Sequence, residues 1–251
     1  MSGIETVDAR DIDDALTVIR RDGVVHLKGL FAKETMQEAA RLVDARHPEF
    51  ADLESKERRR STGKGRFIAP VVVSRALYDL GLFYSEPLKK LGDGMLGEEH
   101  VIEAFGMMMS GAGSLDQGLH ADGVALFPET GLDVIVPPSS MAVFMPLVPV
   151  GSDNGATQFQ LGSHRVPVID ESAPLHHVEE FGPGDAMAWD FRTQHRGKAN
   201  TTDKNRPALH FTLSRPFWFD HQNYDGGEPR LIADADVMER LDQRYVRAQA
   251  V

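Results

Sequence analysis

The chain has 251 residues, of which 41% are hydrophobic and 26% are charged, and this composition is ordinary for a globular protein with a buried core. Its net charge of -11, from 38 acidic and 27 basic residues, disfavours nucleic acid and anionic membranes as partners, because both would repel it. The absence of cysteine excludes disulfides, zinc–thiolate sites, iron–sulfur clusters and thiol nucleophiles, so any metal site must use histidine and carboxylate ligands.

No segment has the pattern of a targeting signal or a membrane span. The N-terminal residues have neither the basic start nor the apolar run of a secretory signal. The richest apolar stretch, Met141 to Val150, is about half the length of a membrane-spanning helix and contains two prolines. We therefore expect a cytoplasmic protein that acts on a small molecule, with no nucleic-acid or membrane partner.

The N-terminal third is predicted to be mostly helical. Apolar residues at helical spacing indicate one helix from Ile12 to Ile19, ended by Gly23, and a second from Met36 to Val43, with a short strand at 24–27 between them. Helical spacing returns over 74–91 and is broken at Glu86-Pro87. The charge run 56–60 and the glycines that follow predict a loop, either solvated or acting as a lid over an anionic ligand.

After Gly97 the pattern changes to short apolar or alternating runs divided by Gly, Pro, Asn and Asp, which are strand and turn signals. Helical spacing returns only at 233–247, where a helix over 237–246 could pack on a neighbouring subunit of a homo-oligomer. We predict a mainly β fold, a double-stranded β-helix (jelly roll or cupin-like barrel) flanked by helices. The expected single domain, 1–251, comprises a helical part at 1–97, a jelly-roll core at 98–218 and a tail at 219–251. The four predicted strands are Val101–Ser110, Met141–Val150, Ala186–Asp190 and Leu209–Ser214.

The tripeptide His120-Ala-Asp122 carries the strongest chemical signal. Alternate residues of a strand face the same side, so both side chains can point into a barrel mouth. His195, 73 positions after Asp122 in a loop-like segment, would complete the two-histidine, one-carboxylate face that holds non-haem Fe(II). Arg206, eleven positions later and before an apparent core strand, can bind a carboxylate bidentately.

With these residues in this order, the sequence resembles the phytanoyl-CoA dioxygenase family of Fe(II)- and 2-oxoglutarate-dependent oxygenases. The resemblance spans about residues 20–216. The matching segments are Gly23-Val-Val-His-Leu-Lys-Gly-Leu30, His120-Ala-Asp122, Asn154-Gly-Ala-Thr157, Gly162-Ser-His-Arg165, Gly184-Asp185, His195-Arg-Gly197, Ala199-Asn200 and Arg206.

The resemblance implies that His120, Asp122 and His195 bind Fe(II), and that Arg206 binds the distal carboxylate of 2-oxoglutarate. Thr157 and Gln117 match positions that commonly help to hold the cosubstrate. The implied reaction uses O2, converts 2-oxoglutarate to succinate and CO2, and hydroxylates a C–H bond of a small organic molecule, here in specialised-metabolite biosynthesis. The carboxylate of Asp122 argues against halogenation, whereas desaturation, epoxidation, ring formation and endoperoxide formation remain open because they depend on substrate placement.

Substrate contacts are sought in the segments that flank the ligands, although core packing is the alternative for each apolar side chain. A non-catalytic jelly-roll protein with a metal site is a second hypothesis. A cupin-type isomerase or hydrolase is a third, and it would not require Arg206. The candidate substrate contacts are Met107, Met108, Phe127, Trp189, Phe191 and Arg192, with Arg66 and Phe67 as a further lid segment.

Overall fold

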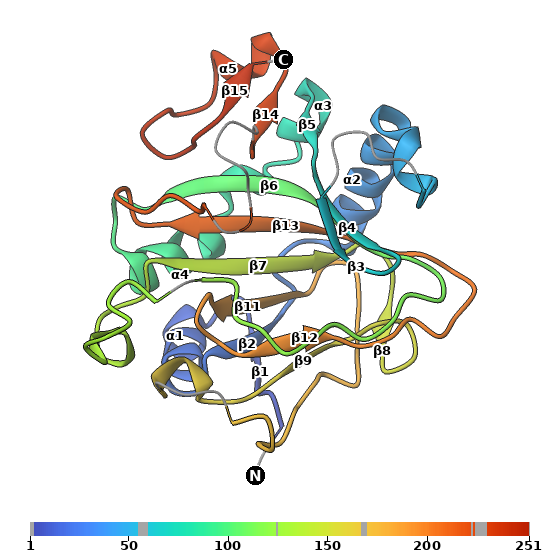
Figure 1. The fold of residues 1–251 in the computed structure, drawn as a ribbon. Helices are drawn as coiled ribbons and strands as arrows, with labels where there is room; N and C mark the ends of the chain where they lie inside the picture. The colour runs from blue at the N-terminus through green and yellow to red at the C-terminus, as the bar shows by residue number, and fades with distance from the viewer. Residues whose placement is uncertain are drawn as a thin grey trace.

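An eight-stranded sheet forms the centre of the computed structural model, which describes residues 3–54, 60–123, 125–166, 170–221, 223 and 230–250. Figure 1 shows its strands running side by side, with β1 and β2 parallel and every other neighbouring pair antiparallel. In spatial order they are β1 (Thr6–Asp8), β2 (Val24–Lys28), β11 (Ala186–Asp190), β7 (Ser140–Pro146), β13 (Arg206–Ser214), β6 (Val101–Ser110), β4 (Arg66–Pro70) and β3 (Arg60–Gly63).

Three smaller sheets complete the β structure. β9 (Thr157–Phe159) pairs with β12 (His195–Gly197), and β8 (Val150–Gly151) pairs with β10 (Glu180–Phe181). β5 (Val72–Val73), β14 (Ile232–Ala233) and β15 (Gln249–Ala250) form a third sheet near the C-terminus (Figure 1). The prediction of a mainly β, jelly-roll-like fold flanked by helices is confirmed, but within the described residues the large sheet does not close into a barrel.

The N-terminal helices follow the predicted spacing. α1 buries Ile12, Leu16 and Ile19 on one face, and Gly23 ends it with a φ of 83° and an N–H bonded to the carbonyl of Ile19. Pro87 lies in the first turn of α4, so it begins a helix instead of breaking one. None of the described helices is long and apolar enough to cross a membrane. The helices are α1 (Ile12–Asp22), α2 (Lys33–Arg46), α3 (Arg75–Tyr78), α4 (Glu86–Leu96) and α5 (Ala235–Met238), with 3-10 turns η1 (Pro48–Ala51), η2 (Leu82–Tyr84), η3 (Leu132–Val134) and η4 (Ser163–Arg165).

The predictions for two other segments were also wrong. The long C-terminal helix is absent: only α5 forms, because the chain after it pairs with β6 through hydrogen bonds from the N–H of Arg247 to Ile102 and from that of Ile102 to Tyr245. The glycine-containing stretch expected to be a loop is the β3–β4 hairpin, in which Gly63 and Gly65 have positive φ. Most of the charge run 56–60 lies outside the described residues.

The two faces of the large sheet have different neighbours. Side chains alternate along each strand, so Leu209 and Phe211 of β13 join the core that also contains the buried faces of α1 and α4. Ala208, the residue before Leu209, packs on the other side, in a smaller core with Phe159 of β9. The face of the sheet opposite the helices therefore packs toward the β9–β12 pair. Arg206, His210 and Thr212 face that same side, because they alternate with Leu209 and Phe211 along β13.

Candidate active site

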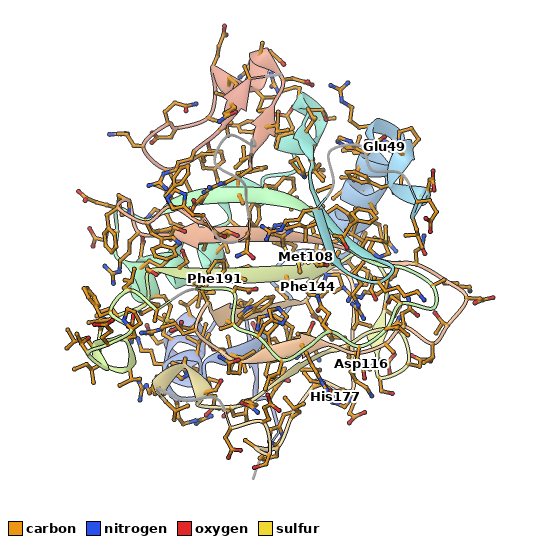
Figure 2. The ribbon with its side chains drawn as sticks, viewed as in Figure 1. Glu49, Met108, Asp116, Phe144, His177 and Phe191 are labelled. Carbon is orange, nitrogen blue, oxygen red and sulfur yellow. The ribbon has the colours of Figure 1, made fainter. Side chains whose placement is uncertain are left out.

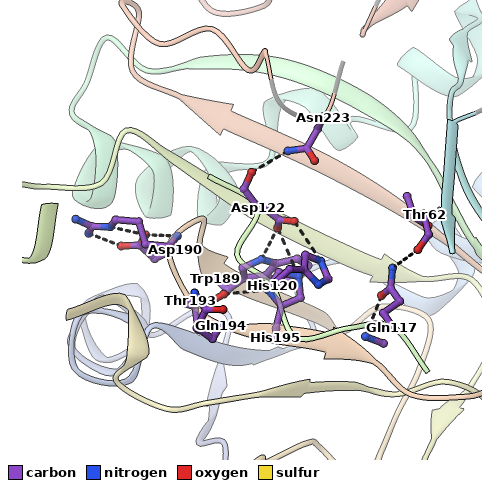
Figure 3. Close-up of polar contacts among 12 residues, drawn as sticks. Thr62, Gln117, His120, Asp122, Trp189, Asp190, Thr193, Gln194, His195 and Asn223 are labelled. Atoms are coloured by element: carbon purple, nitrogen blue, oxygen red, sulfur yellow. Dashed lines mark hydrogen bonds and ion pairs between the residues drawn. The ribbon is translucent and has the colours of Figure 1, made fainter. Parts of the chain in front are cut away.

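A short antiparallel bridge brings the two predicted histidine ligands together. The N–H of His120 donates to the carbonyl of His195 at 3.0 Å, and the N–H of His195 donates back at 2.8 Å. The ring centroids are 4.5 Å apart. His195 lies in strand β12 and not in a loop as predicted, because this segment pairs with β9. Asp122 follows two residues after His120 and its carboxylate reaches the same point (Figure 3).

The three side chains have the donor set and spacing of a metal site. One ligand atom from each of His120, Asp122 and His195 lies within 4.8 Å of the others. Nε2 of His120 is 3.9 Å from Oδ1 of Asp122, and Nε2 of His195 is 3.7 Å from Oδ2. Two imidazoles and one carboxylate on one side suit Fe(II) with open positions for other ligands.

Main-chain carbonyls set the tautomer of both imidazoles. Nδ1 of His120 lies 2.9 Å from the carbonyl of Gly118, and Nδ1 of His195 lies 2.9 Å from that of Thr193. A carbonyl can only accept, so each Nδ1 carries the proton and each Nε2 keeps its lone pair for a metal. Burial lowers the pKa of His195, opposed by the Asp122 carboxylate, so the neutral, metal-binding form is favoured.

Trp189 of β11 orients the carboxylate. Its indole N–H donates to Oδ2 of Asp122 at 2.9 Å, and its ring lies 5.3 Å from that of His195 (Figure 3). Trp189 is a substrate contact predicted from the sequence, and the residue does line the cavity. The hydrogen bond to Asp122 had no signal in the sequence, since the two residues are 67 positions apart.

A cavity extends from the three ligands over the face of β13. Its apolar walls include Met108, Phe144 and Phe191, which Figure 2 labels near the centre of the molecule. Arg66, Gln117, Thr157 and Arg206 also line it. The structure therefore brings the three proposed cosubstrate residues Gln117, Thr157 and Arg206, together with Arg66, to the same cavity as the proposed metal ligands.

Arg206 is almost completely buried, at 4% exposure. One Nη donates to the carbonyl of Gly155 at 2.9 Å, and the guanidinium lies 5.0 Å from the centre of the Phe144 ring. Its Nε has no hydrogen-bond partner among the described residues. Burial, and then the positive charge of Arg66, lower the pKa of Arg206 to about 9. A buried cation with an open donor is suited to an anionic ligand.

Arg66 is a second buried cation beside Arg206. Both residues pair with Ser110, Arg206 from β13 and Arg66 from β4, because β6 runs between these strands. Arg66 donates to the carbonyls of Leu115 and Lys198, which adjoin the His120 and His195 segments. Burial lowers its pKa to about 10. Neither arginine forms an ion pair within the described parts of the chain, so this end of the cavity is positively charged, with the charge of Asp116 partly opposing the effect of burial on the pKa of Arg66.

Gln117 connects three segments around this end. Its side-chain oxygen accepts from the N–H of Gly197 at 2.9 Å, and its amide nitrogen donates to the carbonyl of Thr62 at 2.7 Å (Figure 3). Thr157 lies opposite Gly197 in the β9–β12 pair. The structure gives Gln117 a clear positioning role, and its contact with a cosubstrate stays a prediction, as does that of Thr157.

Three proposed substrate contacts lie elsewhere. Arg192 pairs with Asp190 at 2.6 Å and donates to the carbonyl of Val136 at 2.9 Å. Together with Phe127 it lines a separate depression. Met107 packs in the helix-side core, since it alternates with Met108. Trp189, Met108, Phe191, Arg66 and Phe67 do line the cavity.

Thr212, Asp220 and Asn223 line the cavity and were missed. The sequence could have predicted Thr212, because it lies on the same face as Arg206 in a strand whose odd-numbered residues are apolar. Asp220 and Asn223 follow the last core strand in a segment without periodicity, so no sequence pattern places them near Asp122.

Comparisons with known proteins agree with this architecture. The family model described as phytanoyl-CoA dioxygenase matches residues 19–208. The chain is 25% identical over 219 residues to "Dioxygenase hkm4" of Aspergillus hancockii, covering 81% of this chain and 72% of that protein.

Two solved structures share the fold. The epimerase SnoN, in a complex with Fe3+, alpha ketoglutarate and nogalamycin RO, is similar with a TM-score of 0.61 and 19% identity, over 88% of this chain and 92% of that chain. AviO1 from Streptomyces viridochromogenes Tue57 is similar with a TM-score of 0.60 and 19% identity, over 82% of this chain and 96% of that chain.

Proposed function

Because the chain belongs to the phytanoyl-CoA dioxygenase family of Fe(II)- and 2-oxoglutarate-dependent dioxygenases, we propose that it hydroxylates a C–H bond of a small organic molecule in specialised metabolism. Fe(II) is its cofactor, and 2-oxoglutarate and O2 are its cosubstrates. The observation that carries the assignment of the site is the meeting of His120, Asp122 and His195 in a cavity whose one end holds two buried arginines.

His120, Asp122 and His195 would hold the metal through Nε2, a carboxylate oxygen and Nε2. Each imidazole is kept in the required tautomer by a carbonyl that accepts from Nδ1. The indole N–H of Trp189 fixes the rotation of the Asp122 carboxylate. When bound, Fe(II) and 2-oxoglutarate supply the oxidation of a C–H bond by O2, with release of succinate and CO2.

Arg206 would bind the distal carboxylate of 2-oxoglutarate. Its open Nε and buried guanidinium favour a planar, two-oxygen ligand. Arg66, which pairs with the same residue of β6, adds a second positive charge and therefore fits a cosubstrate contact better than the substrate contact expected from the sequence. Met108, Phe144 and Phe191 would exclude water around the oxidised carbon.

A role in specialised metabolism is supported by the structurally similar proteins, which include an epimerase from nogalamycin biosynthesis. Hydroxylation is the simplest outcome, and desaturation, epoxidation or ring formation would use the same ligands with a different substrate placement. A non-catalytic metal-binding role fits less well, because it gives no reason for two buried arginines without acidic partners. Cytoplasmic location and homo-oligomerisation remain predictions from the sequence.

Anaerobic addition of Fe(II) and 2-oxoglutarate tests the proposal. We expect a metal-to-ligand charge-transfer band that His120→Ala abolishes. Arg206→Ala should weaken 2-oxoglutarate binding by roughly 10-fold to 100-fold, the value of a charge-assisted hydrogen bond or two, whereas the exposed Arg10→Ala should not. Succinate formation should require O2. A wild-type protein without the band, or Arg206→Ala with full cosubstrate affinity, would contradict the assignment.

A further inference from the structure

The cavity has two chemically different ends. β13 contributes Arg206 at one end and Thr212 at the other, six residues or about 20 Å apart along an extended strand. Ala142 of β7 is the register partner of both Thr212 and Trp189, and Trp189 donates to Asp122, so the proposed carboxylate ligand is tied to the sheet at the level of Thr212. The arginine end suits the cosubstrate, which leaves the Thr212 end for the substrate that is oxidised.

Asp220 and Asn223 form the wall at the Thr212 end. The side-chain amide nitrogen of Asn223 donates to the main-chain carbonyl of Asp122 at 3.0 Å (Figure 3). It also donates to Oδ2 of Asp220 at 2.9 Å. The main-chain N–H of Asn223 donates to Oδ1 of Asp220 at 3.0 Å. The wall is therefore tied directly to the residue that carries the proposed carboxylate ligand.

These contacts decide which atoms remain for a substrate. Because the amide nitrogen of Asn223 faces two acceptors, its orientation is fixed and Oδ1 is the atom left over. Within the described parts of the chain, Oδ1 of Asn223 and the hydroxyl of Thr212 take part in no hydrogen bond. Asp220 gives this end of the cavity a buried negative charge, on a carboxylate that accepts both bonds from Asn223 and belongs to a residue that is 1% exposed. No Lys or Arg among the described lining residues lies at this end, since the two that line the cavity are Arg66 and Arg206.

The wall is also held firmly in place. The main-chain N–H of Asp220 donates to Oε1 of Glu103 at 2.9 Å, and Glu103 is itself buried and paired with Arg230. A site on a fixed support can discriminate between ligands, because the acceptors cannot turn away from a mismatched group. An anionic group placed here would meet acceptors and a carboxylate, and would leave its own charge without a partner.

We propose that Thr212, Asp220 and Asn223 select the substrate: it is a neutral or cationic molecule that presents hydroxyl or amine donors beside the oxidised carbon, and not a carboxylate or phosphate. This inference rests on the proposed function, because it assumes that 2-oxoglutarate occupies the arginine end. The surrounding apolar side chains bind the hydrocarbon part of the molecule, and the three polar residues set its orientation.

Matched fragments test this inference without knowledge of the natural substrate. The probes are cyclohexylmethanamine, cyclohexylmethanol and cyclohexanecarboxylate, added to protein saturated with 2-oxoglutarate and loaded with Mn(II) or, as the diamagnetic reference, Zn(II). NMR relaxation of the probe protons measures both affinity and proximity to the metal. We expect the amine and the alcohol to bind near the metal and the carboxylate to bind at least about tenfold more weakly.

Two variants locate the preference. Asp220→Asn, which keeps the main-chain bond to Glu103, should lower the affinity for the amine by about tenfold. Thr212→Val keeps the shape of the side chain and should lower the affinity for the alcohol. Glu239→Gln removes an exposed carboxylate and should change neither. If Asp220→Asn does not fold, the change in alcohol affinity in Thr212→Val tests the proposal by itself.

The outcomes separate the two proposals. Equal binding of the carboxylate and the amine near the metal of the wild-type protein, or an unchanged ranking in the folded variants, overturns this inference. Failure of the wild-type protein to give the charge-transfer band with Fe(II) and 2-oxoglutarate overturns the proposed function instead.

Discussion

The indole nitrogen of Trp189 donates a hydrogen bond of 2.9 Å to Oδ2 of Asp122, so a residue of the central sheet orients the carboxylate of the proposed metal site. Trp189 is 2% exposed and packs against Phe159 and His195. A rigid strand thus restrains a ligand that itself lies outside any strand. Because the carboxylate is already oriented, it loses less conformational entropy when a metal ion binds.

We predict that Trp189→Phe weakens Fe(II) binding by roughly tenfold, because it removes the hydrogen bond and keeps most of the packing. The measurement is an anaerobic Fe(II) titration in the presence of 2-oxoglutarate, followed by the charge-transfer band. The chain has only two tryptophans, so Trp218→Phe is a matched control. Equal Fe(II) affinity in both variants would show that the indole N–H does not position Asp122.

Gly197→Ala should impair cosubstrate binding. A Cβ at this position would lie 2.7 Å from Oε1 of Gln117 and 2.8 Å from a terminal nitrogen of Arg66, and both side chains are anchored by other hydrogen bonds. We expect at least a tenfold loss of 2-oxoglutarate affinity, of the order that one charge-assisted hydrogen bond contributes. Isothermal titration measures it. Gly182→Ala, where a Cβ meets its nearest atom at an ordinary 3.7 Å, should retain affinity.

Glu103→Gln should destabilise the protein. Glu103 is 1% exposed, pairs with Arg230 and accepts from the hydroxyl of Ser214 at 2.6 Å. Loss of its charge breaks the buried ion pair with Arg230, which costs about 3 kcal/mol of unfolding free energy. Denaturant unfolding of the metal-free protein measures this. The exposed pair of Glu38 and Arg41 provides the control, and Glu38→Gln should change stability much less; similar losses would argue against the buried-pair account.

Stability should fall as the pH is lowered from 7 to 5, in part because of His100. This side chain is fully buried, and burial lowers its pKa below the ordinary value of 6.5. Below pH 6.5 the unfolded chain binds a proton that the folded chain does not, so the contribution to stability is complete above that pH and decreases as the pH falls.

The slope of unfolding free energy against pH tests the contribution of His100. His100→Gln should flatten that slope in metal-free protein, whatever its effect on absolute stability. The exposed His221→Gln should leave the slope as it is in the wild-type protein. A slope that is the same in all three proteins would assign the pH dependence to other groups.

The sequence by itself determined the elements and the chemistry. Short apolar runs predicted β6 and β11 with the bounds that the structure has, because a strand that is buried on both faces is apolar along its length. The proposed ligand types, their order and the proposed partner Arg206 likewise follow from residue identity.

Only the tertiary structure decided how these pieces meet. The pairing of Arg66 and Arg206 with Ser110, the bond from Trp189 to Asp122 and the wall of Asp220 and Asn223 depend on strand register and on contacts between distant segments. The same long-range pairing replaced the expected C-terminal helix by an extended segment along β6. Local propensity amounts to tenths of a kcal/mol per residue, and pairing with a buried sheet outweighs it.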